Sequence, residues 1–265
     1  MVTCYAIFII HLSLPPSPLL DPPHPCRYAR PPMSSWPAAV LFDFAGVIVN
    51  SEPLHFLAFH EVLKAERIEI TETEYYQELI GFDDKGAFKH VFAKHGRELD
   101  PKTFLRIMTE KSERMMDLIR ARKYAALPGV EEFVRGLWWH YPLAICSGAL
   151  REEIEAMLEG INLRDCFKVI VAAEDVTVGK PDPSGYLLCA KQLGEKVKKT
   201  LKPEECLIVE DAPTVIKSAK AVGFRTLAVA TSYPAEKLGE ANYVVKDLRP
   251  ATMSAMIPEL QLGAV

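Results

Sequence analysis

Acidic and hydroxyl side chains stand at the ends of three apolar runs in this sequence. The runs read as buried strands, and each ends on a group that could do chemistry: Asp43 in 40–44, Ser147 in 143–147, and Glu210 with Asp211 at the end of 206–210. In open α/β sheets, ligands bind just outside the carboxyl ends of the strands. The sequence therefore predicts one site at this edge, with Gly46 allowing a sharp turn behind Asp43.

These side chains suit a phosphate and a metal. The Ser147 hydroxyl, with backbone N–H groups near Gly148, could hold a phosphate, and Mg²⁺ suits a site of carboxylates and phosphate oxygens. Each residue also has an ordinary alternative. Ser147 could cap a helix that begins near Leu150, Lys180 in Gly-Lys-Pro-Asp-Pro could be a solvated lysine, and the Glu210–Asp211 pair could complement a helix N-terminus.

Four motifs occur in this order along the chain, around Asp43, Ser147, Lys180 and the Glu210–Asp211 pair. Together they resemble the haloacid dehalogenase (HAD) superfamily, in its β-phosphoglucomutase-like branch, over roughly residues 38–248. The resemblance implies that Asp43 is a nucleophile that forms an aspartyl-phosphate, that Ser147 binds the phosphate, and that Lys180 offsets negative charge. It also implies that Mg²⁺ is bound by Asp43, the carbonyl of Ala45, Glu210 and Asp211. His55 matches a cap-hinge histidine of that branch and is a candidate for substrate binding, although it could equally be a polar residue at a helix start.

Ala45 departs from the family pattern, which has a second aspartate two residues after the first. In the family that aspartate protonates the leaving oxygen and later activates water, while its backbone carbonyl binds the metal. Ala45 keeps the carbonyl and loses the carboxylate. We expect metal binding to survive and general acid–base catalysis to be lost, which is a factor of roughly 10²–10⁴ in rate.

Three functions are compatible with that alanine. The first is a Mg²⁺-dependent phosphatase or phosphomutase for a small, sugar phosphate-like metabolite, with impaired activity. The second is a catalytically silent protein that binds phosphate and metal. The third is a C–P hydrolase similar to phosphonoacetaldehyde hydrolase, whose first motif has an alanine here and whose Schiff-base lysine could be Lys85 on a loop facing the site. Asp83 and Asp84 would raise the pKa of Lys85, which argues against the third.

Composition sets the context for these hypotheses. The net charge of −4 gives no basic excess for nucleic acid. The apolar run 5–10 is too short for a membrane span and lacks the basic start of a secretory signal. Cys146 and Cys206 lie in strand-like runs and read as buried free thiols of a reducing compartment. We therefore expect a cytoplasmic protein, a monomer or weak dimer, whose partner is a small phosphorylated substrate.

The alternation of strand-like and helical runs predicts an α/β fold, a Rossmann-like parallel sheet with an inserted α-helical cap domain. Residues 1–33 read as a disordered Pro-rich leader, 34–53 and 124–265 as the core, and 54–123 as the cap. The aromatic residues of 56–59 and 138–140 are expected to pack in a core. The remaining expected strands and the expected helix signals are strands 168–172, 226–229 and 243–245, helix starts at Thr71, Asp100, Pro183 and Pro213, and a helix end at Gly223.

Overall fold

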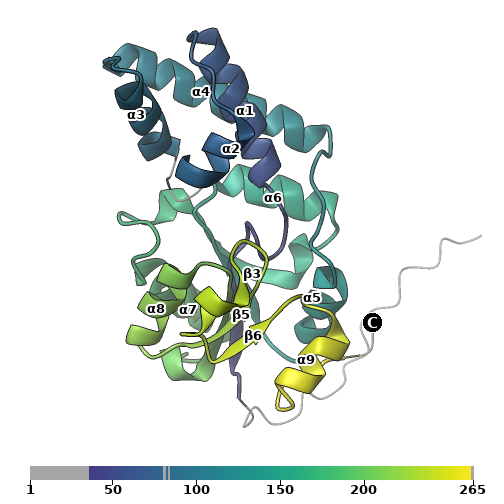
Figure 1. The fold of residues 1–265 in the computed structure, drawn as a ribbon. Helices are drawn as coiled ribbons and strands as arrows, with labels where there is room; N and C mark the ends of the chain where they lie inside the picture. Colours follow the sequence, from purple (N-terminus) through teal and green to yellow (C-terminus); the bar gives the residue numbers. More distant parts are fainter. Residues whose placement is uncertain (1–35, 80–81, 83, 264–265) are drawn as a thin grey trace, which may run out of the picture. The chain divides into compact units, whose positions relative to one another are not determined.

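The computed structural model describes residues 36–79, 82 and 84–263, and its centre is a parallel β-sheet (Figure 1). The sheet has six strands in the order β3-β2-β1-β4-β5-β6. The predicted α/β class and all six predicted strands are confirmed, with ends that shift by at most two residues. The strands are β1 (Ala39–Phe42), β2 (Leu143–Cys146), β3 (Phe167–Val171), β4 (Cys206–Glu210), β5 (Arg225–Val229) and β6 (Tyr243–Val245).

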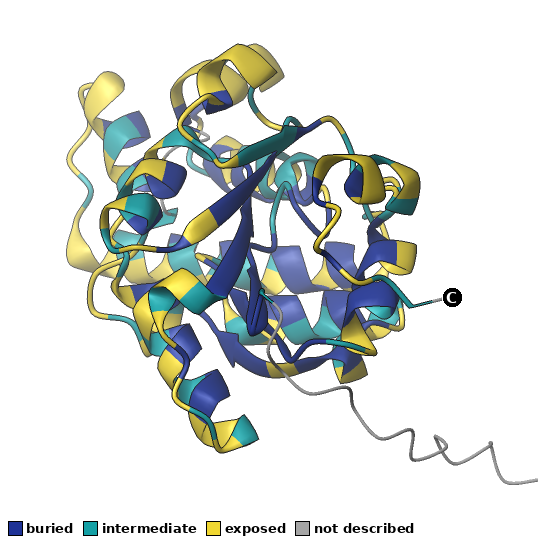
Figure 2. Ribbon diagram, turned by 90° about the horizontal axis from the view of Figure 1, so that it is seen from below, coloured by how far each residue is buried: buried dark blue, intermediate teal, exposed yellow. Residues whose placement is uncertain are grey.

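The strands are apolar because helices cover both faces of the sheet, as is usual for parallel sheets. Alternate residues of β1 face opposite sides, so Val40 and Phe42 join one core cluster while Ala39 and Leu41 join the other. The first cluster takes side chains from α5 (Val130–Trp138), α6 (Arg151–Gly160) and α9 (Pro250–Met256). The second takes them from α7 (Ser184–Val197) and α8 (Pro213–Ala221). Figure 2 shows the buried strands between helices whose outer sides are exposed.

Short helices complete the connections of the sheet: η2 (Arg164–Cys166), η3 (Ala173–Asp175), η4 (Pro203–Glu205) and η5 (Ala235–Leu238). The predicted start of α8 at Pro213 is confirmed, and Gly223 has a φ of 100° where the chain leaves that helix. The predicted start at Pro183 is one residue early, because Pro183 is the residue that precedes the first turn of α7.

The stretch between β1 and α5 is helical, as predicted. Its elements are α1 (Glu52–Ala65), α2 (Glu72–Glu74), η1 (Tyr75–Leu79), α3 (Asp84–Lys94) and α4 (Pro101–Arg120). We call them the helical segment. Thr71 and Glu74 form the predicted capping box, and the Asp100 carboxylate accepts from the N–H groups of Lys102 and Thr103 at the start of α4.

The helical segment has an apolar core of its own, built around Phe59, Phe88 and Phe92. Its separation from the sheet is incomplete, since Met115 and Ile119 near the end of α4 belong to the cluster on the sheet. The boundaries of a separate cap domain therefore stay a prediction. The predicted leader, 1–33, lies outside the described residues.

Two predictions about aromatic side chains have different outcomes. Phe59 is buried and Phe56 packs beside it, as expected. The prediction for Trp138 and Trp139 is wrong: they are 38% and 53% exposed, because they lie at the end of α5, where the helix leaves the sheet.

The thiols of Cys146 and Cys206 are free and buried, as predicted. Within the described part of the chain, no helix is both long and apolar enough to cross a lipid bilayer.

Candidate active site

Lys180 joins two carboxylates at the carboxyl edge of the sheet. Its Nζ lies 2.6 Å from Oδ1 of Asp43 and 2.8 Å from Oε1 of Glu210. The hydroxyl of Tyr186 lies 3.2 Å from both Lys180 Nζ and Glu210 Oε1, which closes a small buried network. Three of the predicted site residues, far apart in the sequence, are therefore in direct contact.

The sheet brings these groups together through its strand order. β1 and β4 are neighbours, and the Asp43 N–H donates to the carbonyl of Val209 at 2.9 Å. Asp43 and the Glu210–Asp211 pair thus leave adjacent strands side by side. Lys180 arrives from the connection between β3 and α7, so its ammonium is delivered by a loop rather than by a strand end.

Burial and crowding of like charges set the electrostatics of the site. Burial, with a further contribution from Glu210, raises the pKa of Asp43 to about 6 although Lys180 acts in the opposite direction. Burial, Asp43 and Glu210 raise the pKa of Asp211 to about 8. Burial opposes the charge on Lys180, yet Asp43 and Glu210 hold its pKa well above the usual range. Lys180 is therefore charged, and a further positive charge would relieve the two aspartates.

The donor set fits a hard divalent cation. Asp43, Glu210 and Asp211 are all buried, and one ligand oxygen from each lies within 4.8 Å of the others. Carboxylate oxygens are the ligands that Mg²⁺ prefers. A single lysine leaves this cluster of three carboxylates with excess negative charge, which a divalent ion would neutralise.

The hydrogen bonds distinguish the three carboxylates. Both oxygens of Glu210 are engaged, Oε1 by Lys180 and Oε2 by the N–H groups of Asp211 and Ala212 at 2.7 and 2.8 Å. Glu210 thus also accepts hydrogen bonds from the backbone at the start of α8, which is the alternative role that the sequence analysis gave to the Glu210–Asp211 pair. Among the described residues, none donates to the carbonyl of Ala45, which leaves that oxygen available with one oxygen each of Asp43 and Asp211.

Two hydroxyl groups that the sequence analysis missed form hydrogen bonds on the other side of the three carboxylates. Ser232 Oγ donates to Oδ2 of Asp211, and Thr231 Oγ1 donates to the carbonyl of Gly46. A signal existed for them, since they follow the predicted strand 226–229 at the same sheet edge. Tyr186 gave no comparable signal because it lies inside a helix.

Ser147 lies at the same edge, at the end of β2, and is buried. Its Oγ accepts from the N–H of Ala149 at 3.1 Å. It does not cap α6, whose N-cap residue is Leu150 without a side-chain bond. A Cβ on Gly148 would meet no heavy atom within 4 Å, so open space lies beside this turn.

The two predicted substrate-side residues have different surroundings. His55 lies in the first turns of α1, and its Nδ1 is 2.9 Å from Nζ of Lys111. The prediction that Lys85 lies on a loop is wrong: Lys85 is an exposed residue in the first turn of α3. Asp84 precedes it and forms an ion pair with Lys111 at 2.7 Å, while Asp83 lies outside the described residues.

Comparisons with known proteins show what the chain is similar to. Residues 40–229 match the family described as haloacid dehalogenase-like hydrolase. The chain is 29% identical to protein CbbY of Rhodobacter capsulatus over 84% of this chain and 98% of that protein. It is 29% identical to the fructose-1-phosphate phosphatase YqaB of Escherichia coli over 72% of this chain and 96% of that protein. The β-phosphoglucomutase structure from Clostridium difficile superposes with a TM-score of 0.69 at 22% identity, covering 80% and 92% of the two chains.

Proposed function

Because the chain belongs to the haloacid dehalogenase-like hydrolases, we propose that it is a Mg²⁺-dependent phosphatase of a small phosphorylated metabolite that works through an aspartyl-phosphate on Asp43. The observation that carries this proposal is the contact of Lys180 with both Asp43 and Glu210 beside a third buried carboxylate. The names of the relatives, which include a sugar-phosphate phosphatase, support a phosphorylated small molecule as substrate.

Asp43 provides the nucleophile in this reaction. An oxygen of its carboxylate attacks phosphorus, the bond from phosphorus to the ester oxygen breaks, and the electron pair leaves with that oxygen. Lys180 keeps Asp43 ionised, while the Ser147 hydroxyl and the N–H groups of the turn at Gly148 face the phosphoryl oxygens. Attack of water on the aspartyl-phosphate then releases inorganic phosphate and regenerates the carboxylate.

The metal would be held by Asp43, Asp211 and the carbonyl of Ala45, with Glu210 holding Lys180 and the start of α8. When bound, Mg²⁺ offsets the charge of the transferred phosphoryl group. Ser232 and Thr231 fix Asp211 and the Gly46 turn from the other side.

Ala45 determines which esters suit this site. The methyl side chain can neither protonate the leaving oxygen nor take a proton from water, and its partly exposed position lies directly beyond Asp43. Esters with leaving groups that need no proton, such as aryl and acyl phosphates, should react fastest. Alkyl phosphates should be slower by roughly 10²–10⁴-fold than they would be with an acid present.

Ala45 also favours a second candidate, a protein that binds phosphate and metal without turnover. The C–P hydrolase hypothesis gains no support from the exposed position of Lys85 on α3. Borohydride in the presence of phosphonoacetaldehyde should therefore trap no adduct at that lysine.

Hydrolysis of p-nitrophenyl phosphate and of acetyl phosphate tests the proposal. We expect turnover of both with Mg²⁺, its loss with EDTA, and its loss in Asp43→Asn, which keeps the shape of the side chain but removes the nucleophile. Turnover that persists in Asp43→Asn would reject the mechanism. Binding of phosphate and Mg²⁺ without turnover of either ester would select the silent alternative.

A further inference from the structure

A buried lysine of the helical segment takes no part in the proposed chemistry. Lys111 on α4 is only 1% exposed, and its Nζ lies 2.7 Å from Oδ2 of Asp84. Burial of a lysine is costly unless its charge is paired. Asp84 supplies that pairing, so the charge of Lys111 is already neutralised within the protein.

His55 completes this contact as a neutral ring. An ammonium can only donate, so the 2.9 Å contact with Lys111 makes Nδ1 of His55 the acceptor and leaves the proton on Nε2. Burial and the charge of Lys111 both hold the pKa of His55 well below its usual value. His55 therefore contributes a polar group to the cluster and no positive charge.

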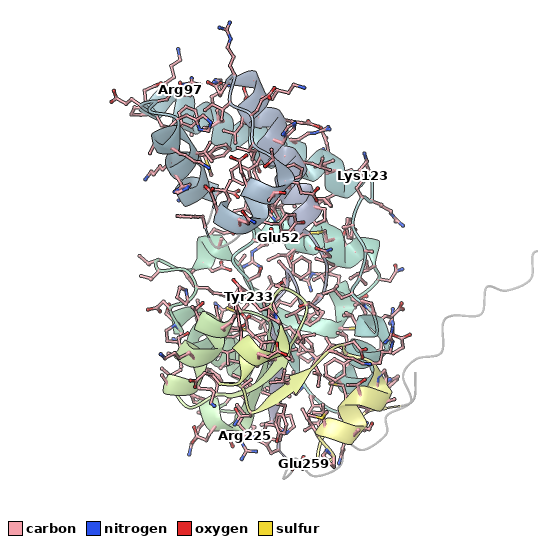
Figure 3. The ribbon with its side chains drawn as sticks, in the orientation of Figure 1. Glu52, Arg97, Lys123, Arg225, Tyr233 and Glu259 are labelled. Atoms are coloured by element: carbon pink, nitrogen blue, oxygen red, sulfur yellow. The ribbon has the colours of Figure 1, made fainter. Side chains whose placement is uncertain are left out.

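Glu52 adds a carboxylate that has a neutral partner. It lies at the start of α1, where the helical segment meets the part with the sheet (Figure 3). Its Oε2 accepts from the hydroxyl of Tyr75 at 2.9 Å. Burial raises the pKa of Glu52, although the bond from Tyr75 lowers it in part. That bond orients the carboxylate without supplying a positive charge, and the charge of Lys111 compensates it only in part.

Glu153 is a buried carboxylate on α6, the helix that packs against α4. It is 2% exposed, and no described residue donates a hydrogen bond to its Oε1. Burial raises the pKa of Glu153; the charge of Lys111 lowers it and the charge of Asp84 raises it further, so Glu153 lies within electrostatic range of both. A buried acceptor without a donor is rare and costly in folded proteins, so this oxygen points to a ligand.

The position of these residues relates them to the candidate active site. α1 and α6 both begin at the carboxyl edge of the sheet, shortly after Asp43 and Ser147 respectively. α4, which carries Lys111, packs against both helices. The organic part of a phosphate ester held at Asp43 would extend toward this group, which we call the acidic cluster: Glu52, His55, Asp84, Lys111 and Glu153.

We propose that the acidic cluster selects phosphate monoesters whose organic part carries hydroxyl or ammonium donors and rejects those that carry a second phosphate. The inference rests on the proposed phosphatase function. Lys111 is the one cation among three carboxylates in the cluster, so a second phosphate would meet net negative charge, whereas a donor would satisfy Oε1 of Glu153. A phosphomutase must hold a bisphosphate when the aspartyl-phosphate passes its phosphoryl group to a second hydroxyl, so the cluster favours hydrolysis.

Competition against p-nitrophenyl phosphate tests the selectivity without requiring turnover of the competitor. Glucosamine 6-phosphate, glucose 6-phosphate and glucose 1,6-bisphosphate share one ring and differ in charge. We expect inhibition constants to rise in that order, at least about tenfold from first to last. Equal or tighter binding of the bisphosphate would overturn the inference while leaving the phosphatase function intact.

Glu153→Gln removes the charge and keeps the shape of the side chain. The ratio of the inhibition constant of the bisphosphate to that of glucosamine 6-phosphate should therefore shrink at least about threefold. Glu152→Gln is the matched control, an exposed neighbour on the same helix, and should leave the ratio unchanged. Glu52→Gln provides a second variant should Glu153→Gln fold poorly. An unchanged ratio in both cluster variants would reject the inference. If p-nitrophenyl phosphate is not hydrolysed, the proposed function fails, and the shifts of melting temperature with the same three ligands decide the selectivity separately.

Discussion

At the scale of single residues, Ala45 has the largest predicted effect on rate. Restoring a carboxylate with Ala45→Asp should raise kcat/KM for an alkyl phosphate by at least about 10²-fold, because position 45 lies just beyond the nucleophile at the carboxyl edge of the sheet and an acid there could protonate the leaving oxygen. The gain for acetyl phosphate should be much smaller, since its leaving group needs no proton. Steady-state rates on the two esters measure the difference.

Ala45→Asn is the control for this change. It adds a polar side chain of the same shape that cannot transfer a proton, so it should give no comparable gain. Equal gains on both esters would show that the new carboxylate acts by another route. No gain on any ester would show that the site binds without turnover.

Lys180 should contribute to stability as well as to chemistry. Lys180→Met leaves Asp43 and Glu210 buried beside each other without their cation. Breaking a buried ion pair in this way should lower the free energy of unfolding by about 3–5 kcal/mol. Urea unfolding in EDTA measures the loss, and Lys85→Met, at an exposed lysine, should change it by no more than about 0.5 kcal/mol.

Single residues also differ in how far the sequence reveals them. Asp43, Ser147 and Glu210 could be predicted because each ends an apolar run, and strand ends share one edge of the sheet. Tyr186 and Glu153 could not, since each is an ordinary helical residue whose role depends on which helix packs against which strand. That information lies in the tertiary contacts.

At the scale of elements, the turn between β1 and α1 holds the aspartates in place. Gly46 has a φ of 80°, and a Cβ there would overlap Oδ2 of Asp211. Gly46→Ala should therefore destabilise the protein by more than the roughly 1 kcal/mol expected for a positive φ alone, and should weaken Mg²⁺ binding. Calorimetric titration with MgCl₂ and urea unfolding measure the two effects.

Gly96→Ala separates the cost of the positive φ from the cost of the overlap with Asp211. Gly96 also has a positive φ, 63°, but a Cβ there meets nothing within 4 Å. This variant should show the conformational cost without any loss of metal affinity. If Gly46→Ala lowered the free energy of unfolding and the Mg²⁺ affinity no more than Gly96→Ala does, the close approach of the turn to Asp211 would have no effect on stability or metal binding.

Local sequence patterns predict the elements, whereas the division into domains stays a prediction. The strands and the capping signals are local, so apolar runs and residues such as Thr71 and Asp100 reveal them. α4 was harder to assign because its early residue Ile107 packs in the helical segment while Met115 packs on the sheet. A helix shared between two cores gives no boundary in the sequence.

At the scale of the whole molecule, stability should depend on pH through the aspartates. The pKa values of Asp43 and Asp211, about 6 and about 8, lie above the ordinary 3.8. The folded state thus holds protons that the unfolded state has released, so the stability of the metal-free protein should fall as pH rises from about 4 to about 8. Mg²⁺ competes with these protons, and its stabilising effect should grow across the same range.

Melting temperatures in EDTA and in MgCl₂, measured at pH 5.5 and 8, test this dependence. The increase in melting temperature from EDTA to MgCl₂ should be larger at pH 8 than at pH 5.5. Asp211→Asn, which cannot bind the proton, should flatten the decline in EDTA and reduce the effect of Mg²⁺. A difference that is the same at both pH values in the unaltered protein would contradict the assignment of the aspartates.

The place of β1 in the sheet has a consequence for synthesis of the chain. β1 pairs Val40 with Leu143 on one side and Ala39 with Cys206 on the other, so the strand that precedes the nucleophile is made before both of its partners. A growing chain must carry this apolar strand with the side that pairs with β4 open until residues 206–210 are made, and such distant pairings form slowly. Until Cys206–Glu210 has left the ribosome, the nascent protein presents an unpaired edge of β1 that a chaperone could bind, and it can have no active site.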